Sequence, residues 1–161
     1  MKRAMMLAAM LSAAPLAAAA PPAVIASSEL SSHAARAMVD ACLALAGTKG
    51  WKMHVAVLDR GGGLIAYGRS DGAVAGSRDV AMAKARTAAL MGWPSELFGT
   101  IAYGKDGKTP GPMSTVPGMN GVPGGFPVKA GDALLAGIGV SGSMPTDDAA
   151  CAKHGLEAAG F

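Results

Sequence analysis

Residues 53–68, MHVAVLDRGGGLIAYG, decide the fold of this chain. Residues 53–59 form a short, largely apolar run that is typical of a strand, and residues 64–68 form a second such run. The glycines at 61–63 lie between them and predict a turn. Two strands joined by so short a turn form a β-hairpin, so we expect an antiparallel sheet.

Helices are predicted on both sides of this hairpin in the sequence. Residues 28–46 repeat apolar side chains at helical spacing, with Ser27 or Ser28 as the N-cap. Residues 77–91 begin at another natural cap, Ser77, and form the clearest helix of the chain. One face of this helix carries only small side chains, which allow a helix to lie close on a sheet: Ala81, Ala85 and Ala88.

The C-terminal half completes the pattern. A short helix over residues 93–103 is followed by residues 104–125, a long loop rich in proline and glycine. A second hairpin pairs residues 126–129 with residues 133–140, and Ser143 caps a final helix. This order of elements predicts an α+β domain in which helices cover the faces of an antiparallel sheet.

The N-terminus has the features of a cleavable export signal. Lys2 and Arg3 precede residues 4–16, which are almost entirely apolar or small, and an alanine run follows. Secretory signals combine a positive start, an apolar stretch of about 7–15 residues and a small-residue cleavage site. We therefore expect cleavage close to Ala19 or Ala20 and a periplasmic or secreted product.

The product, residues 21–161, is expected to form a single domain without a membrane anchor, because about 140 residues is an ordinary domain size. Loss of Lys2 and Arg3 lowers the formal charge from +3 to +1. No basic run remains, which argues against nucleic acid or an anionic membrane surface as a partner.

The two cysteines, Cys42 and Cys151, lie in predicted helices near opposite ends of the product. Their spacing matches neither a redox motif nor a zinc site. In an oxidising compartment they either form a disulfide or remain as two buried thiols. A disulfide requires the two terminal helices to pack side by side.

The sequence contains no complete catalytic constellation. Residues 137–142, GIGVSG, match a dinucleotide-binding spacing, but the chain leaves no room for the following parallel strand. We interpret them as a tight strand-to-helix turn with close backbone packing. His33, His54 and His154 are scattered without a metal-binding spacing, although one imidazole suffices as an axial ligand of heme.

Four segments, taken together, resemble the GlcG/HbpS family, the heme-binding domain group that includes the C-terminal domain of PduO. They are residues 57–62 (VLDRGG), 83–88 (AKARTA), 123–128 (PGGFPV) and 137–142 (GIGVSG). They occur in the family's order and spacing, and the resemblance runs from about residue 30 to residue 155.

The resemblance implies a five-stranded antiparallel sheet flanked by helices, related to profilin-like or roadblock-like folds, and assembly into homo-oligomers. Several members bind heme, some through a histidine of the first helix, which His33 alone could match here. The family's pocket maps onto Asp59, Lys84 and the loop Gly124, Gly125, Phe126 and Pro127. Residues 104–120 depart from the commoner family pattern.

Three hypotheses follow. In the first, the chain is an exported heme-binding protein, a carrier or sensing accessory, with His33 or His54 as the axial ligand. Lys84 or Arg86 then lies near the propionates, although a solvated surface charge is the alternative for both. In the second, the chain is an enzyme or accessory acting on a small organic acid or carbonyl compound, with Lys84 as the charged group and Asp59 as acid or base. The third is a purely structural oligomer.

Overall fold

The structure, a computed structural model, describes residues 27–161, so the predicted export signal lies outside the described residues. The elements in chain order are α1 (Ser32–Lys49), β1 (His54–Asp59), β2 (Leu64–Arg69), α2 (Ser77–Met91), α3 (Ser95–Tyr103), the 3-10 turn η1 (Pro112–Thr115), β3 (Gly125–Ala130), β4 (Ala133–Ser141) and α4 (Pro145–Ala158). The predicted order of helices and hairpins is confirmed.

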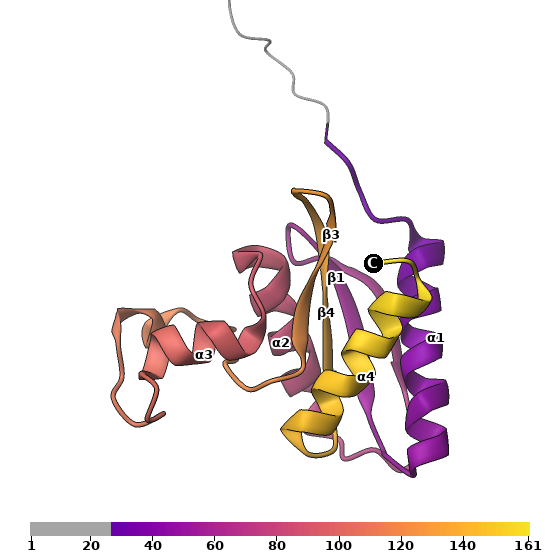
Figure 1. Cartoon of the computed structure of the whole chain (residues 1–161). Helices are drawn as coiled ribbons and strands as arrows, with labels where there is room; N and C mark the ends of the chain where they lie inside the picture. Colours follow the sequence, from indigo (N-terminus) through magenta and orange to yellow (C-terminus); the bar gives the residue numbers. More distant parts are fainter. Residues whose placement is uncertain (1–26) are drawn as a thin grey trace, which may run out of the picture.

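The four strands form one antiparallel sheet in the order β2-β1-β4-β3. Helices α1 and α4 lie side by side on one face, and α2 covers the other face (Figure 1). Helix α3 and the long loop after it project from the α2 side, away from the sheet (Figure 1). The α+β class is therefore confirmed, with three layers.

The five-stranded sheet implied by the resemblance is wrong, because residues 27–161 contain four strands. The segment between α2 and β3 forms α3, η1 and loops instead. Four prolines in this segment lack the N–H that a strand donates to its neighbour, which disfavours a further strand there: Pro110, Pro112, Pro117 and Pro123.

Side chains alternate across the sheet as the hairpin pattern predicts. Val55 and Val57 point into the main core between the sheet and the α1–α4 pair. His54, Ala56 and Leu58 take the opposite face, where Ala56 and Leu58 pack against α2. His54 thus points away from the main core, as expected from its position.

The glycines of residues 137–142 allow α2 to lie directly on β4. A Cβ atom on Gly139 would lie 2.2 Å from the carbonyl oxygen of Ala81 and 2.3 Å from the backbone N of Ala85. Gly137 is equally close to the α2 backbone, with 2.4 Å to the backbone N of Ala89. The predicted close packing is confirmed, and the small-residue face of α2 meets a glycine face on the strand. The predicted strand-to-helix turn is wrong for residues 137–141, which belong to β4.

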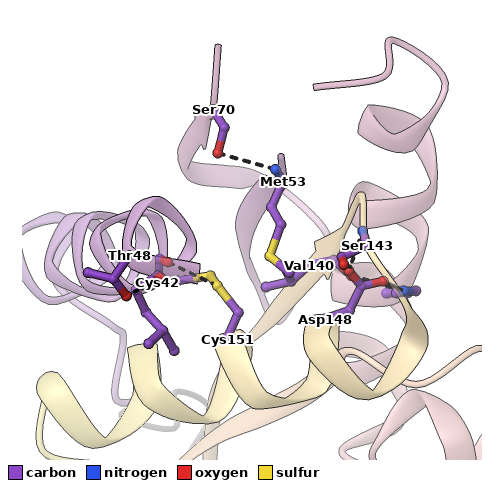
Figure 2. Close-up of a disulfide and its surroundings, with 10 residues drawn as sticks. Cys42, Thr48, Met53, Ser70, Val140, Ser143, Asp148 and Cys151 are labelled. Carbon is purple, nitrogen blue, oxygen red and sulfur yellow. Dashed lines mark hydrogen bonds and ion pairs between the residues drawn. A yellow bond between two sulfur atoms is a disulfide. The ribbon is translucent and has the colours of Figure 1, made fainter. Parts of the chain in front are cut away.

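Cys42 of α1 and Cys151 of α4 form a disulfide, which resolves the alternative left open by the sequence. Figure 2 shows the bond between the two helices, and both cysteines are fully buried. The bond joins residues that are 109 positions apart, so it encloses the whole sheet and α2. In the chain-entropy account a loop of about 100 residues gains about 4.7 kcal/mol from such a cross-link.

Two helix starts differ from the prediction. Helix α1 begins at Ser32 rather than near Ser28, because Ser31 accepts a hydrogen bond from the backbone N of Ala34. Helix α4 begins at Pro145, and Met144 rather than Ser143 is its N-cap. The Ser143 hydroxyl donates a hydrogen bond to the side chain of Asp147 in the first turn. No helix within residues 27–161 is both long and apolar enough to cross a membrane.

Candidate functional site

An apolar cavity lies between α2 and the β1–β2 hairpin, on the face of the sheet opposite the disulfide. Its volume is about 530 Å³, within the range of about 300–1,000 Å³ usual for small-molecule sites. We call it the hairpin cavity, and its lining comprises Leu58, Gly62, Leu64, Tyr67, Arg78, Asp79, Met82, Ala83, Arg86 and Gly118.

Two arginines of α2 give the hairpin cavity positive charge. Arg78 lies in the first turn and pairs with Asp79 at 2.9 Å, but both side chains are well exposed, so the pair contributes little to stability. Arg86 lies against Gly62 and Gly118 and is exposed. Within residues 27–161 Arg86 has no carboxylate partner. Its guanidinium is therefore free to bind an acidic ligand.

Tyr67, on the cavity wall, is hydrogen-bonded to His54, which does not itself line the cavity. His54 is 2 % exposed, and its Nδ1 lies 2.6 Å from the hydroxyl of Tyr67. Its Nε2 lies 3.0 Å from the carbonyl oxygen of Val74. A carbonyl can only accept, so Nε2 carries a proton, and in the neutral imidazole Nδ1 accepts a hydrogen bond from the Tyr67 hydroxyl. Both ring nitrogens of His54 are therefore occupied.

Lys84 lies behind the hairpin cavity and does not line it. Its Nζ donates to Asp148 Oδ2 at 2.7 Å and to the carbonyl oxygen of Val140 at 2.9 Å. Lys84 is 1 % exposed and Asp148 2 %. Figure 2 shows Asp148 beside Val140 and Ser143, whose backbone N donates to Asp148 Oδ1. The lysine thus joins α2 to the end of β4 and the first turns of α4.

Burial and pairing act in opposite directions on these two groups. Burial lowers the pKa of Lys84 below its ordinary value of 10.5, and the hydrogen bond and charge of Asp148 oppose that change. Burial likewise raises the pKa of Asp148 above 3.8, while Lys84 and the backbone N–H of Ser143 pull it down. Desolvation is the larger effect for both groups.

The loop predicted for the pocket packs around this ion pair. A Cβ atom on Gly124 would lie 3.0 Å from Lys84 Nζ, and φ at Gly124 is 122°, a conformation that suits glycine. Gly125 lies against the Lys84 backbone, while Phe126 lies on the other face of the sheet, with Lys153 Nζ 5.3 Å from its ring centre. Neither Gly124, Gly125, Phe126 nor the following residue, Pro127, lines the hairpin cavity.

Asp59 and His33 also lie outside the cavity. Asp59 ends β1, and its Oδ1 accepts hydrogen bonds from the backbone N of Gly61 at 2.7 Å and of Gly63 at 2.8 Å. It therefore holds the hairpin turn, and it borders a separate, more polar hollow of about 330 Å³. His33 is exposed in the first turn of α1, in the opposite layer from α2. Of the residues singled out in the sequence, the structure brings only Arg86 to the cavity wall and His54 next to it.

Sequence reasoning missed three residues of this region. Arg78, Tyr67 and Asp148 belong to no motif. Tyr67 pairs with Ala56 and so shares a face with His54, but this register depends on the shift between Val57 and Leu58, which the sequence does not signal. Asp148 gave no signal either, since it lies 64 positions from Lys84. Among residues 27–161 no cluster of three metal-binding side chains occurs.

Comparison with known proteins gives a consistent result. The model of the family described as "Haem degrading protein HbpS-like" matches residues 30–157. A solved double mutant of HbpS from Streptomyces reticuli is 34% identical, with a TM-score of 0.77, covering 93% of this chain and 99% of its own. No curated protein matches.

Two more distant structures share the fold. The protein ORFY of Klebsiella pneumoniae is 21% identical with a TM-score of 0.80, over 88% of this chain and 97% of its own. A PduOC:heme complex is 23% identical with a TM-score of 0.74, over 81% of this chain and 95% of its own. That neighbour was solved with heme bound.

Proposed function

We propose that this chain, which belongs to the HbpS-like family of haem degrading proteins, binds heme in the hairpin cavity. The observation that carries the proposal is an apolar cavity with an arginine on its wall, Arg86, that has no carboxylate partner within residues 27–161. The PduOC:heme complex, which shares the fold, supports the choice of ligand.

The residues present fit this ligand. Heme combines a broad apolar ring with two propionates, and the cavity offers Leu58, Leu64 and Met82 to the ring. Arg86 and Arg78 offer planar, charged donors to the carboxylates, a geometry that arginine matches well. When bound, heme supplies an iron centre whose chemistry depends on its axial ligand and on the polarity around it. The cysteines are not candidate ligands, because they form the disulfide.

The alternative of an enzyme for small organic acids finds less support. That hypothesis needs Lys84 and Asp59 at one site. Lys84 contacts Val140 near the end of β4, whereas Asp59 pairs with Ala136 at the other end of the β1–β4 ladder. Lys84 forms a buried ion pair with Asp148, and Asp59 accepts hydrogen bonds from the backbone of the hairpin turn. Neither side chain is therefore free to act on a substrate.

The proposed protein is exported and self-associates. A protein cut near residue 20 and delivered to an oxidising compartment would form the Cys42–Cys151 disulfide, which supports a periplasmic or secreted location. The heme-bearing form is proposed to be a homo-oligomer. N-terminal sequencing of the product recovered outside the cytoplasm, and its mass by light scattering, test these two points.

The first experiment is a hemin titration followed by the Soret absorbance. The protein is produced from the full-length chain, and Arg86→Gln is compared with Arg36→Gln. Arg36 is a matched control because it lies exposed on α1, in the opposite layer, where it donates only to Ser32. We expect saturation at one heme per chain.

Arg86→Gln should weaken the hemin Kd about tenfold or more, because a hydrogen bond to a charged group contributes about 1.5–3 kcal/mol. Arg36→Gln should leave the Kd unchanged. A rise in absorbance that never saturates, or equal Kd values for both variants, would refute binding in the hairpin cavity.

A further inference from the structure

We propose that Tyr67 is the axial iron ligand of heme in the hairpin cavity and that His54 takes its proton. This inference rests on the proposed heme site and adds the residue that holds the iron. It departs from the histidine ligands expected from the sequence.

Tyr67 is the tyrosine whose side chain lines the hairpin cavity. Tyr67 lies on β2 opposite Ala56 of β1, so its ring is on the α2 face of the sheet, as part of the cavity wall. The residue is 37 % exposed, so part of its side chain is open to the cavity while its hydroxyl contacts His54. Phenol oxygen is among the protein groups that hold heme iron.

A short hydrogen bond joins the Tyr67 hydroxyl to His54. The distance of 2.6 Å between the Tyr67 hydroxyl and Nδ1 is short, and the bond runs in one direction because Val74 fixes the proton on Nε2. His54 is 2 % exposed, so the ring has a fixed orientation and its basic nitrogen is aimed at the phenol. The geometry therefore holds the phenol oxygen next to a nitrogen that can accept its proton.

The transfer of the proton from Tyr67 to His54 needs no oxidant or reductant. If Tyr67 Oη held ferric iron, its O–H bond would break, the electron pair would stay on oxygen, and the proton would pass to Nδ1 of His54. Nδ1 then donates a hydrogen bond back to the oxygen, and Nε2 still donates to the Val74 carbonyl. No electron is transferred, and both hydrogen bonds of the imidazole survive with their partners unchanged. A ligand supported in this way by a second residue is a recurrent feature of metal sites.

The other candidates fit the cavity less well. His54 would have to break both of its hydrogen bonds to reach iron. His33 lies in the opposite layer, on α1. Met82 does line the cavity, but a neutral thioether is a softer ligand than a phenolate and suits ferric iron less well.

The test compares Tyr67→Phe with Tyr103→Phe on the ferric, hemin-loaded protein. Tyr103 is the second of the two tyrosines in the chain and is similarly exposed, on α3, so it is a matched control. The readouts are the hemin Kd, the charge-transfer absorption of a ferric tyrosinate, and its phenolate ring modes in resonance Raman spectra. Thermal unfolding of the heme-free variants checks that each is folded.

We expect the tyrosinate signature in the unmodified protein and in Tyr103→Phe, and its loss in Tyr67→Phe with weaker hemin binding. His54→Asn keeps an acceptor near the position of Nδ1 but removes the base. It should retain a ferric heme complex with shifted phenolate modes and a Kd weakened about 10–100-fold, the usual cost of losing a ligand's supporting partner.

Three results would overturn the inference, and they are distinguishable. If hemin saturates the unmodified protein and binding depends on Arg86, but the spectra of Tyr67→Phe are unchanged, the heme site stands and Tyr67 is not its ligand. If the unmodified protein binds hemin without a tyrosinate signature, and its heme spectrum changes in His33→Ala or Met82→Leu but not in Tyr67→Phe, that residue is the ligand instead. If the unmodified protein shows no saturable binding, the proposed function and the ligand fail together.

Discussion

Replacing Lys84 by methionine tests the buried ion pair behind the cavity. The change removes the ammonium but keeps most of the apolar stem, so the space inside the protein changes little. It leaves the Asp148 carboxylate 2 % exposed, with the backbone N–H of Ser143 as its remaining donor to Oδ1. It also removes the hydrogen bond that Lys84 donates to the carbonyl oxygen of Val140.

The expected loss in free energy of unfolding is about 3–5 kcal/mol, the usual cost of removing one partner of a buried pair. This is a large part of the roughly 5–15 kcal/mol that stabilises a typical domain. At roughly 3–5 °C per kcal/mol for a domain of this size, Tm should fall by roughly 10–25 °C.

The measurement is urea unfolding with the disulfide intact, beside Lys105→Met as a control. Lys105 is exposed in the long loop, so its replacement should change the free energy of unfolding by no more than about 0.5 kcal/mol. A loss below about 1 kcal/mol for Lys84→Met would refute the argument that the carboxylate depends on the lysine.

The loss should also depend on pH. Lys84 pulls down the pKa of Asp148, which burial raises, so its removal raises that pKa further above 3.8. The folded variant then keeps a proton that the unfolded chain releases, and its stability falls as pH rises from about 4 through the raised pKa. The difference between Lys84→Met and the unmodified protein should therefore shrink in acid. An unchanged difference between pH 4 and pH 7 would contradict this.

Two further predictions concern packing and the cross-link. Gly139→Ala should lower the free energy of unfolding by at least about 1–3 kcal/mol, because its Cβ would collide with the α2 backbone, whereas Gly47→Ala in α1 meets no atom within 4 Å and should stabilise by about 0.5–1 kcal/mol. Urea unfolding of both variants checks the contrast, and equal effects would refute the close approach. Replacing both cysteines by serine should cost about 4–5 kcal/mol, since the disulfide closes 109 residues. Unfolding with and without a reductant tests this, and the double variant should no longer respond to the reductant.

Local patterns in the sequence predicted most of the fold. Alternation placed His54 and Val55 on opposite faces, and the glycines of residues 137–142 predicted close backbone packing. The fifth strand, implied by the resemblance, was wrong because residues between α2 and β3 form α3 and proline-rich loops. A family pattern gives no information on how an individual member builds its variable segment.

The candidate site was predicted less well, because its chemistry depends on contacts between distant residues. The family resemblance placed Lys84 in the pocket, yet its side chain pairs with Asp148 of α4. The partner of His54 is set by the register of the hairpin, which shifts between Val57 and Leu58. Nothing in the local sequence announces such a shift, so Tyr67 was not recognised as the neighbour of the imidazole.

The disulfide between α1 and α4 has a consequence for the proposed export of the chain. Proteases outside the cytoplasm attack exposed loops first, and residues 104–111 are largely exposed. Any single cut between Cys42 and Cys151 leaves both fragments joined by the bond. A nicked molecule would therefore keep β3, β4 and α4 attached to the rest of the sheet, and would run as one species on a gel until a reductant separates it.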